Sequence, residues 1–77
     1  MKHETDLIYD FILENELTTT DALDLALACS GTNLETLNYI IYYFTGYHDI
    51  EQLHDCEASN YYFNDDIIKF YGLDKAV

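Results

Sequence analysis

Carboxylates are the side chains through which this sequence could do chemistry, because they recur at helical spacing. Asp6, Asp10 and Glu14 are four residues apart, so on a helix they would form one stripe with roughly 6 Å between successive charges. Adjacent phosphates on one DNA strand are separated by a similar distance, roughly 6–7 Å through space. Asp21 and Asp24 could extend the stripe beyond the next turn. The spacing predicts a surface that can take the place of nucleic-acid phosphates.

The net charge favours the same interpretation. The chain has 15 Asp and Glu residues against 3 Lys, and its formal net charge is −12 at pH 7. Solubility of a small domain needs a net charge of only about 2–8 in magnitude, and a larger excess destabilises the compact state. Solubility, or an acidic bias of the source proteome, is the alternative explanation. If the charge is functional, the partner is a basic, nucleic-acid-binding protein, and the further acidic contacts are Asp49, Glu51, Asp55, Asp65 and Asp66.

The residues that could support metal binding or catalysis do not match a known pattern. His48, Glu51 and Asp55 would share a helix face and could hold a divalent ion, but the sequence has no CxxC and no HExxH. A nucleophilic pair of Cys56 with a histidine would need a cleft, which a thin core rarely builds. We therefore expect no metal, no cofactor and no enzymatic activity.

Tyrosines supply a second candidate surface. The chain has 8 Tyr, and Tyr39, Tyr43 and Tyr47 gather around the end of one predicted helix. Tyrosine is favoured at interface hot spots because it gives contact area at low entropic cost. Some of these rings must instead complete a small core. The alternative to mimicry is therefore a regulatory or structural interaction module, in which a Tyr/Leu surface binds a partner helix or forms a homodimer.

The elements that position these side chains are predicted to be helices. We expect one domain over residues 1–77, an all-α bundle of four to five short helices near 4–16, 21–29, 34–45, 49–55 and 65–71. Leu7, Ile8, Phe11 and Ile12 define the inward face of the first helix. In the third helix, residues 34, 37, 40, 41 and 44 are expected to face inward. The Ala/Leu-rich second helix should be the most buried element.

Capping residues mark the helix ends. Thr5 and Asn64 are expected N-caps, Thr32 is expected to open a capping box with Glu35, and Asp49 to Gln52 form another N-terminal signature. Glycines at 31, 46 and 72 should end helices. The segment 60–63 could be a short strand, a loop or helical.

The second and third helices form a helix-turn-helix-like central pair. The outward residues of its would-be recognition helix include no cation, and affinity for DNA comes mainly from Lys and Arg. We therefore expect no direct contact with nucleic acid. With no apolar run long enough to span a membrane and no secretory signal, the expected location is the cytoplasm, with Cys29 and Cys56 reduced.

One stretch of the chain resembles known proteins. The segments TLNYII, starting at Thr36, and TGYHDIEQ, starting at Thr45, look like parts of short acidic proteins encoded by phages and other mobile elements. In size, acidity and tyrosine content the chain is similar to anti-CRISPR and other anti-defence proteins, several of which block the basic channel of an effector. The resemblance implies an inhibitor of a CRISPR effector or another defence or DNA-processing protein. Those proteins share no motif, so no site residue is carried over from them.

Overall fold

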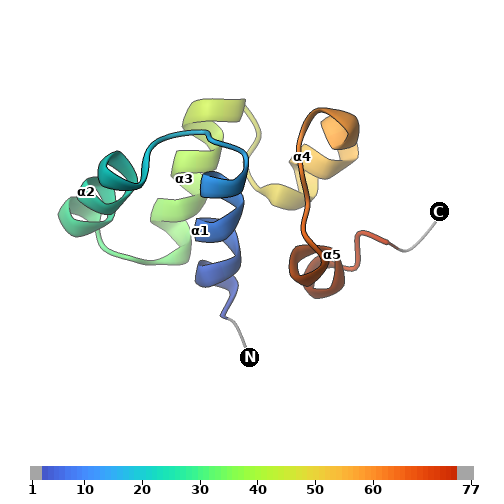
Figure 1. The fold of residues 1–77 in the computed structure, drawn as a ribbon, viewed down its shortest axis with the longest axis horizontal. Coiled ribbons are helices and arrows are strands. Elements are labelled where there is room, and N and C mark those ends of the chain that lie inside the picture. The colour runs from blue at the N-terminus through green and yellow to red at the C-terminus, as the bar shows by residue number, and fades with distance from the viewer. Residues whose placement is uncertain (1–2, 75–77) are drawn as a thin grey trace.

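The predicted all-α architecture is confirmed. The computed structural model describes residues 3–74, which contain helices and no strand (Figure 1). Its elements are α1 (Glu4–Glu14), α2 (Thr20–Ser30), α3 (Leu34–Thr45), α4 (Ile50–Glu57), the 3-10 turn η1 (Ala58–Asn60) and α5 (Asp65–Tyr71).

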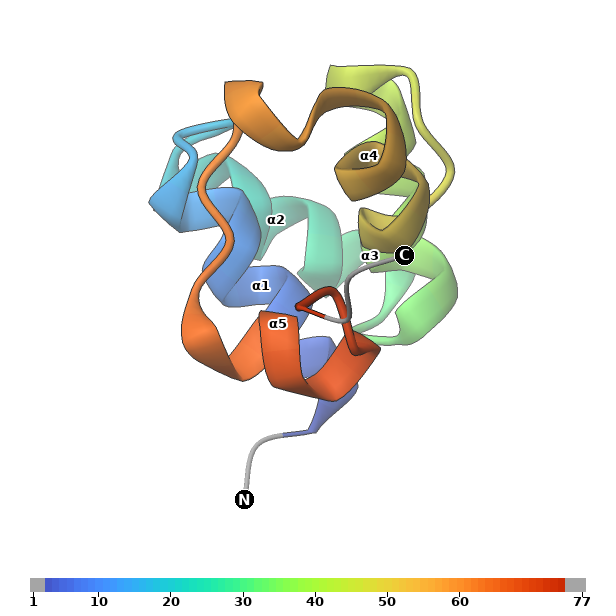
Figure 2. The ribbon, with the colours of Figure 1, turned by 90° about the vertical axis from the view of Figure 1, so that its right-hand side faces the viewer.

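Helix α3 is the centre of the arrangement, since it contacts α1, α2 and α4. Helix α1 packs beside α3 and also contacts α5. As a result α2 lies on one side of the α1–α3 pair, while α4 and α5 lie on the other (Figures 1 and 2). The described chain measures 39 × 28 × 19 Å along its principal axes.

The core is built from aliphatic side chains and one phenylalanine. Phe11 is fully buried, and its ring lies 5.3 Å from that of Phe63 and 6.3 Å from that of Tyr61, centroid to centroid. No polar or charged residue in the described range is buried. The predicted inward face of α1 is confirmed. The buried side chains are Leu7, Ile8, Phe11, Ile12, Leu23, Leu27, Leu37, Ile40, Ile41, Ile50, Leu53 and Ile67.

Most of the predicted helix ends are confirmed. The side chains of Asp49 and Asn64 accept hydrogen bonds from the backbone amides of Gln52 and Ile67, at 2.8 and 2.9 Å. Gly46 and Gly72 end α3 and α5 in the left-handed conformation, which glycine adopts without steric cost.

Two predicted N-caps were wrong. Helix α1 begins after His3 rather than at Thr5, and α3 is capped by Asn33, whose Oδ1 accepts from the Thr36 amide at 2.9 Å. Thr32 and Asn33 are both good capping types, so the residue types alone did not separate them.

Helix α2 is not the most buried element, contrary to the prediction. Only Leu23 and Leu27 are buried in it, and Leu25 is 66% exposed. The reason is its position at the edge of the molecule, where it packs against α3 and no further helix lies beyond it (Figure 1). In α3, Leu34 and Phe44 were expected to face inward and are 37% and 46% exposed.

The segment 60–63 forms no strand, and its backbone hydrogen-bonds to the side chain of Asn15. Tyr61 is extended, but the hydrogen bonds of Tyr62 go to Asn15: Tyr62 N donates to Asn15 Oδ1 at 2.7 Å, and Asn15 Nδ2 donates to the Tyr62 carbonyl at 2.9 Å. Asn15 is available because α1 ends at Glu14 rather than at the predicted Glu16, which takes a positive φ of 53°. This pairing attaches the end of α1 to the segment before α5.

Candidate partner-binding surfaces

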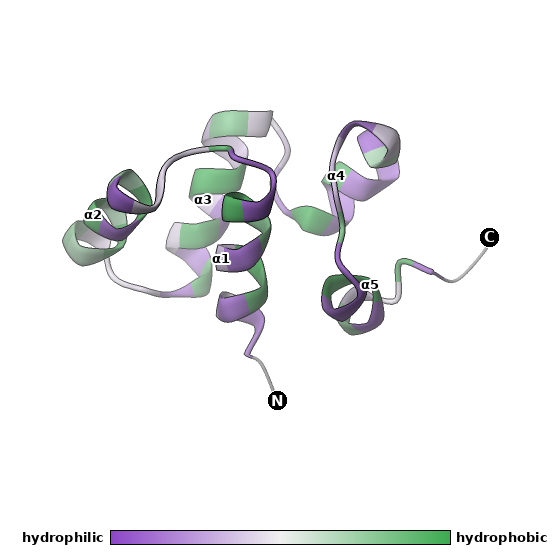
Figure 3. Cartoon of the chain, in the orientation of Figure 1, coloured by the Kyte–Doolittle hydropathy of each residue, from purple (hydrophilic) through white to green (hydrophobic). Residues whose placement is uncertain are grey.

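The orientation of the acidic stripe on α1 is set by the side chains that α1 buries in the core. Because Leu7, Ile8, Phe11 and Ile12 fix the inward face, Asp6, Asp10 and Glu14 form a stripe outside that face along a single helix, and Glu14 lies nearest its edge. Asp6 and Glu14 are exposed and Asp10 is partly exposed. Hydrophilic residues recur in purple along the face of α1 that is turned to the viewer in Figure 3. The predicted four-residue spacing is therefore present on an unbroken helix.

Asp24 of α2 joins the stripe through a tyrosine. The Tyr9 hydroxyl donates to Asp24 Oδ1 at 2.7 Å. This hydrogen bond, followed by desolvation and the charges of Asp24 and Asp10, raises the pKa of Tyr9 above its ordinary value. Asp6, Tyr9 and Asp24 line one hollow of about 460 Å³ between α1 and α2. Asp21 is exposed one turn before Asp24 on α2.

The first turn of α5 joins the other end of the stripe. Asn64 caps α5 with its Oδ1 and donates from its Nδ2 to Glu14 Oε1 at 2.7 Å. This bond brings the start of α5 next to the end of α1, and the two residues that follow Asn64 in the first turn of α5 are acidic. We call the combined surface the α1 acidic band, and it consists of Asp6, Asp10, Glu14, Asp24, Asp65 and Asp66.

The other predicted acidic contacts are not part of this band. Asp49 caps α4 and Glu51 lies in its first turn, on the side where Tyr71 OH donates to Glu4 Oε2 at 2.8 Å. Burial, then the Glu4 hydrogen bond and the charges of Glu4, Glu51 and Asp49, raise the pKa of Tyr71 well above its ordinary 10.0. Asp55 is exposed farther along α4. The predicted acidic contacts in the C-terminal half thus divide into those in the first turn of α5 and those at or in α4.

Helix dipoles explain part of the acidity without any partner. Each α-helix has an acidic residue in its first turn, where a negative charge is worth typically about 0.3–1 kcal/mol. Asp10 and Glu14 are different, because they occupy the middle and the C-terminal end of α1, and the last turn of α1 has no basic residue. A carboxylate at a helix C-terminus is unfavourable. The dipole of α1 therefore does not explain these two residues, and first-turn placement likewise does not explain Asp24 of α2 or Asp55 and Glu57 of α4.

The aromatic candidates also separate. Tyr39 and Tyr43 lie one turn apart on α3 and are 65% and 68% exposed. Tyr47 is only partly exposed and packs against the core, and desolvation, followed by a hydrogen bond to Glu57, raises its pKa. We therefore assign Tyr47 to the packing of α4 rather than to an exposed surface.

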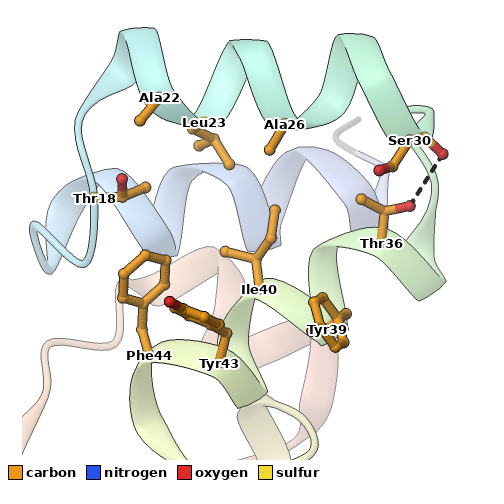
Figure 4. Close-up of a pocket in the computed structure, with 10 residues that line it drawn as sticks. All are labelled: Thr18, Ala22, Leu23, Ala26, Ser30, Thr36, Tyr39, Ile40, Tyr43 and Phe44. Atoms are coloured by element: carbon orange, nitrogen blue, oxygen red, sulfur yellow. Dashed lines mark hydrogen bonds between the residues drawn. The ribbon is translucent and has the colours of Figure 1, made fainter.

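A groove that the sequence did not reveal lies between α2 and α3 (Figure 4). It has a volume of about 270 Å³. Ala22 and Ala26, four residues apart on α2, leave it open because their side chains are short. That spacing of small residues was the available signal. We call it the α2–α3 groove, and it is lined by Thr18, Ala22, Leu23, Ala26, Ser30, Thr36, Tyr39, Ile40, Tyr43 and Phe44.

Within residues 3–74 the structure shows neither a group of metal ligands nor a disulfide. No three His, Cys, Asp or Glu side chains there are grouped as a metal site would require, so His48, Glu51 and Asp55 do not come together as one. Cys29 and Cys56 are both exposed and unbonded to each other. In that same range no helix has the length and apolar character that crossing a membrane demands.

Comparison with known proteins gives no assignment: no family model, curated protein or solved structure matches the chain. The functional argument therefore rests on the chain's own residues.

Proposed function

We propose that this chain is a non-enzymatic binding protein that acts as a nucleic-acid mimic in the cytoplasm of a bacterial host. In this proposal the α1 acidic band occupies the basic nucleic-acid-binding site of a partner protein, such as a CRISPR effector or another defence or DNA-processing protein. Asp10 and Glu14 replace phosphates at the centre of the band. Asp6, Asp24, Asp65 and Asp66 extend it on either side, and Asp21 continues it along α2.

The observation that carries the proposal is the placement of acidic residues along the whole length of α1. Charges near helix N-termini have a local explanation, but Glu14 lies where the dipole opposes it. The Tyr9–Asp24 hydrogen bond holds a carboxylate of α2 against α1, and the Asn64–Glu14 hydrogen bond holds the start of α5 beside the end of α1. A rigid anionic surface of this kind attracts a basic cleft over long range and in a salt-dependent way.

The test uses the chain as bait in a lysate of the bacterial host at low ionic strength. A captured partner is then titrated with the chain at about 0.05 M and about 0.5 M salt, in the presence and absence of duplex DNA. We expect DNA to compete with the chain, and the affinity to fall steeply with salt. Equal affinity at both salt concentrations, or simultaneous binding of DNA and the chain, would show that the charges do not substitute for phosphates.

The chain offers a matched pair of double variants. Asp10→Asn with Glu14→Gln removes two charges from the band, while Glu51→Gln with Asp55→Asn removes two charges from α4. Both variants have the same net charge. We expect only the first to weaken partner binding strongly. An equal loss in both would mean that net charge, and not the band, determines affinity.

A second candidate function is supported by a different observation. Tyr39 and Tyr43 are exposed beside an apolar groove, which is typical of a protein–protein contact. On this hypothesis the chain is an interaction module, and its acidity serves solubility. Charge reversal at Asp6, Asp10 and Glu14 should then leave partner binding intact, whereas Tyr39→Ala or Tyr43→Ala should abolish it.

A further inference from the structure

The α2–α3 groove has an apolar floor and an aromatic edge. Leu23 and Ile40 form its base and are 1% and 8% exposed. Figure 4 shows Ala22 and Ala26 on the side of α2 that faces α3, and the rings of Tyr39, Tyr43 and Phe44 on α3 across from them. None of its lining residues is charged, although the chain as a whole is strongly acidic. The groove is therefore an uncharged, largely apolar recess on a strongly acidic chain.

Its dimensions favour side chains of another protein over a small molecule. Pockets that enclose a small ligand usually have about 300–1,000 Å³ and bury most of it. The groove has about 270 Å³ and lies open along the two helices. A helix laid into such a groove would place apolar side chains from successive turns between α2 and α3. The exposed rings of Tyr39 and Tyr43, one turn apart, would then flank it.

The charge of the chain selects among protein occupants. At one end of the groove, Ser30, Thr36 and Tyr39 also line a neighbouring hollow together with the exposed carboxylate of Glu35. A Lys or Arg next to an apolar stripe could pair with that carboxylate. A second copy of the chain would bring another −12 of charge to the same surface, and like charges across an interface are unfavourable.

We infer that the α2–α3 groove binds a short amphipathic helix of a basic partner protein, with apolar side chains entering the groove and Lys or Arg side chains meeting Glu35 at its end. This inference rests on the second candidate function and specifies the partner's chemistry. It does not require the α1 acidic band to contact the same segment.

The test is an NMR titration of the isotope-labelled full chain with three synthetic peptides. The first has Leu at i, i+3, i+4 and i+7 and Lys on its remaining face. The second has the same composition with the Leu positions scattered, and the third has Glu in place of Lys. We expect amide shifts at Ala22, Ala26, Tyr39 and Tyr43 with the first peptide, and binding about tenfold or more weaker with each of the other two.

A matched tyrosine pair locates the contact. Tyr43 is 68% exposed on the groove and Tyr62 is 59% exposed away from it, so either can be truncated without emptying the core. Tyr43→Ala should weaken binding of the first peptide about tenfold or more, as expected for an interface hot spot. Tyr62→Ala should bind it normally, and so should the Asp10→Asn, Glu14→Gln double variant.

Four results would overturn the inference. They are equal binding of the scattered-Leu peptide, shifts confined to α1, no shift up to millimolar peptide, or self-association of the free chain that Tyr43→Ala removes. The last would identify a second copy as the occupant. Shifts confined to α1 and lost in the Asp10→Asn, Glu14→Gln variant would leave the mimicry proposal standing while removing this one, so the two failures are distinguishable.

Discussion

Asn15 makes three side-chain hydrogen bonds, two of which connect the end of the first helix to the last third of the chain. Its Nδ2 donates to the Phe11 carbonyl at 3.0 Å and to the Tyr62 carbonyl at 2.9 Å, and its Oδ1 accepts from Tyr62 N at 2.7 Å. Asn15→Ala removes all three bonds without opening a cavity in the core, because Asn15 is itself partly exposed. We expect this variant to be clearly destabilised.

The size of the effect follows from these contacts. A hydrogen bond contributes a net amount of about 0.5–1.5 kcal/mol. Since Tyr62 is exposed, water can replace part of each lost bond, and we take the lower half of that range for each bond. The three bonds together then contribute about 2 kcal/mol. A domain of this size has a total stability of only about 4–12 kcal/mol. At about 4–8 °C per kcal/mol, the Tm should fall by about 8–16 °C.

The assay is thermal and urea unfolding followed by circular dichroism, with Asn38→Ala as the control. Asn38→Ala deletes the same atoms from within α3, where alanine is the better helix former, so its Tm should stay the same or rise slightly. Hydrogen exchange adds a local measure, because the Tyr62 amide should exchange faster in Asn15→Ala. A Tm loss smaller than about 2 °C would refute the claim that this side chain attaches the end of α1 to the segment before α5.

Three further predictions concern strain, pH and salt. Gly46→Ala should cost about 1 kcal/mol, because φ is +82° there while a new Cβ would meet nothing within 4 Å; urea unfolding would measure this, and Gly46→Asn should lose less. The folded state holds the Tyr71 proton more tightly than the unfolded chain, whose pKa is near 10.0, so its contribution is intact below about pH 10 and declines as pH rises further. In Tyr71→Phe the alkaline loss of stability should be shallower, and identical pH profiles would contradict this. Raising NaCl from about 0.01 M to about 0.5 M should raise the Tm, since screening weakens repulsion within a chain of charge −12; a flat response would mean that the charges are already compensated.

Local signals in the sequence were enough to predict where most helices begin and end. Asp49 and Asn64 are N-capping residue types that precede apolar helical residues, and Gly46 is a C-capping type that ends α3 in the left-handed conformation. These features act within a few residues of one another, so they can be recognised without knowledge of the fold. The stripe on α1 could be predicted for the same reason, because its spacing depends only on the helix.

Features that depend on packing between distant segments could not be predicted. The composition of α2 suggested burial, but exposure of Leu25 depends on how many neighbours cover the helix, and α3 covers only one face. The pairing of Asn15 with Tyr62 joins residues 47 positions apart. Likewise, the start of α5 lies beside Glu14 because Asn64 bonds to both its own helix and α1.

These distant bonds have a consequence for the order in which the chain can fold during synthesis. Helix α1 is synthesised before the segments that bond to it, because Asn15, Glu14 and Glu4 accept hydrogen bonds from residues 47, 50 and 67 positions later. A helix of 11 residues is marginal in water on its own. Helix α1 therefore stays incompletely covered until the segment through α5 has been synthesised, and a nascent chain stopped before Phe63 should leave Phe11 open to chaperones and proteases.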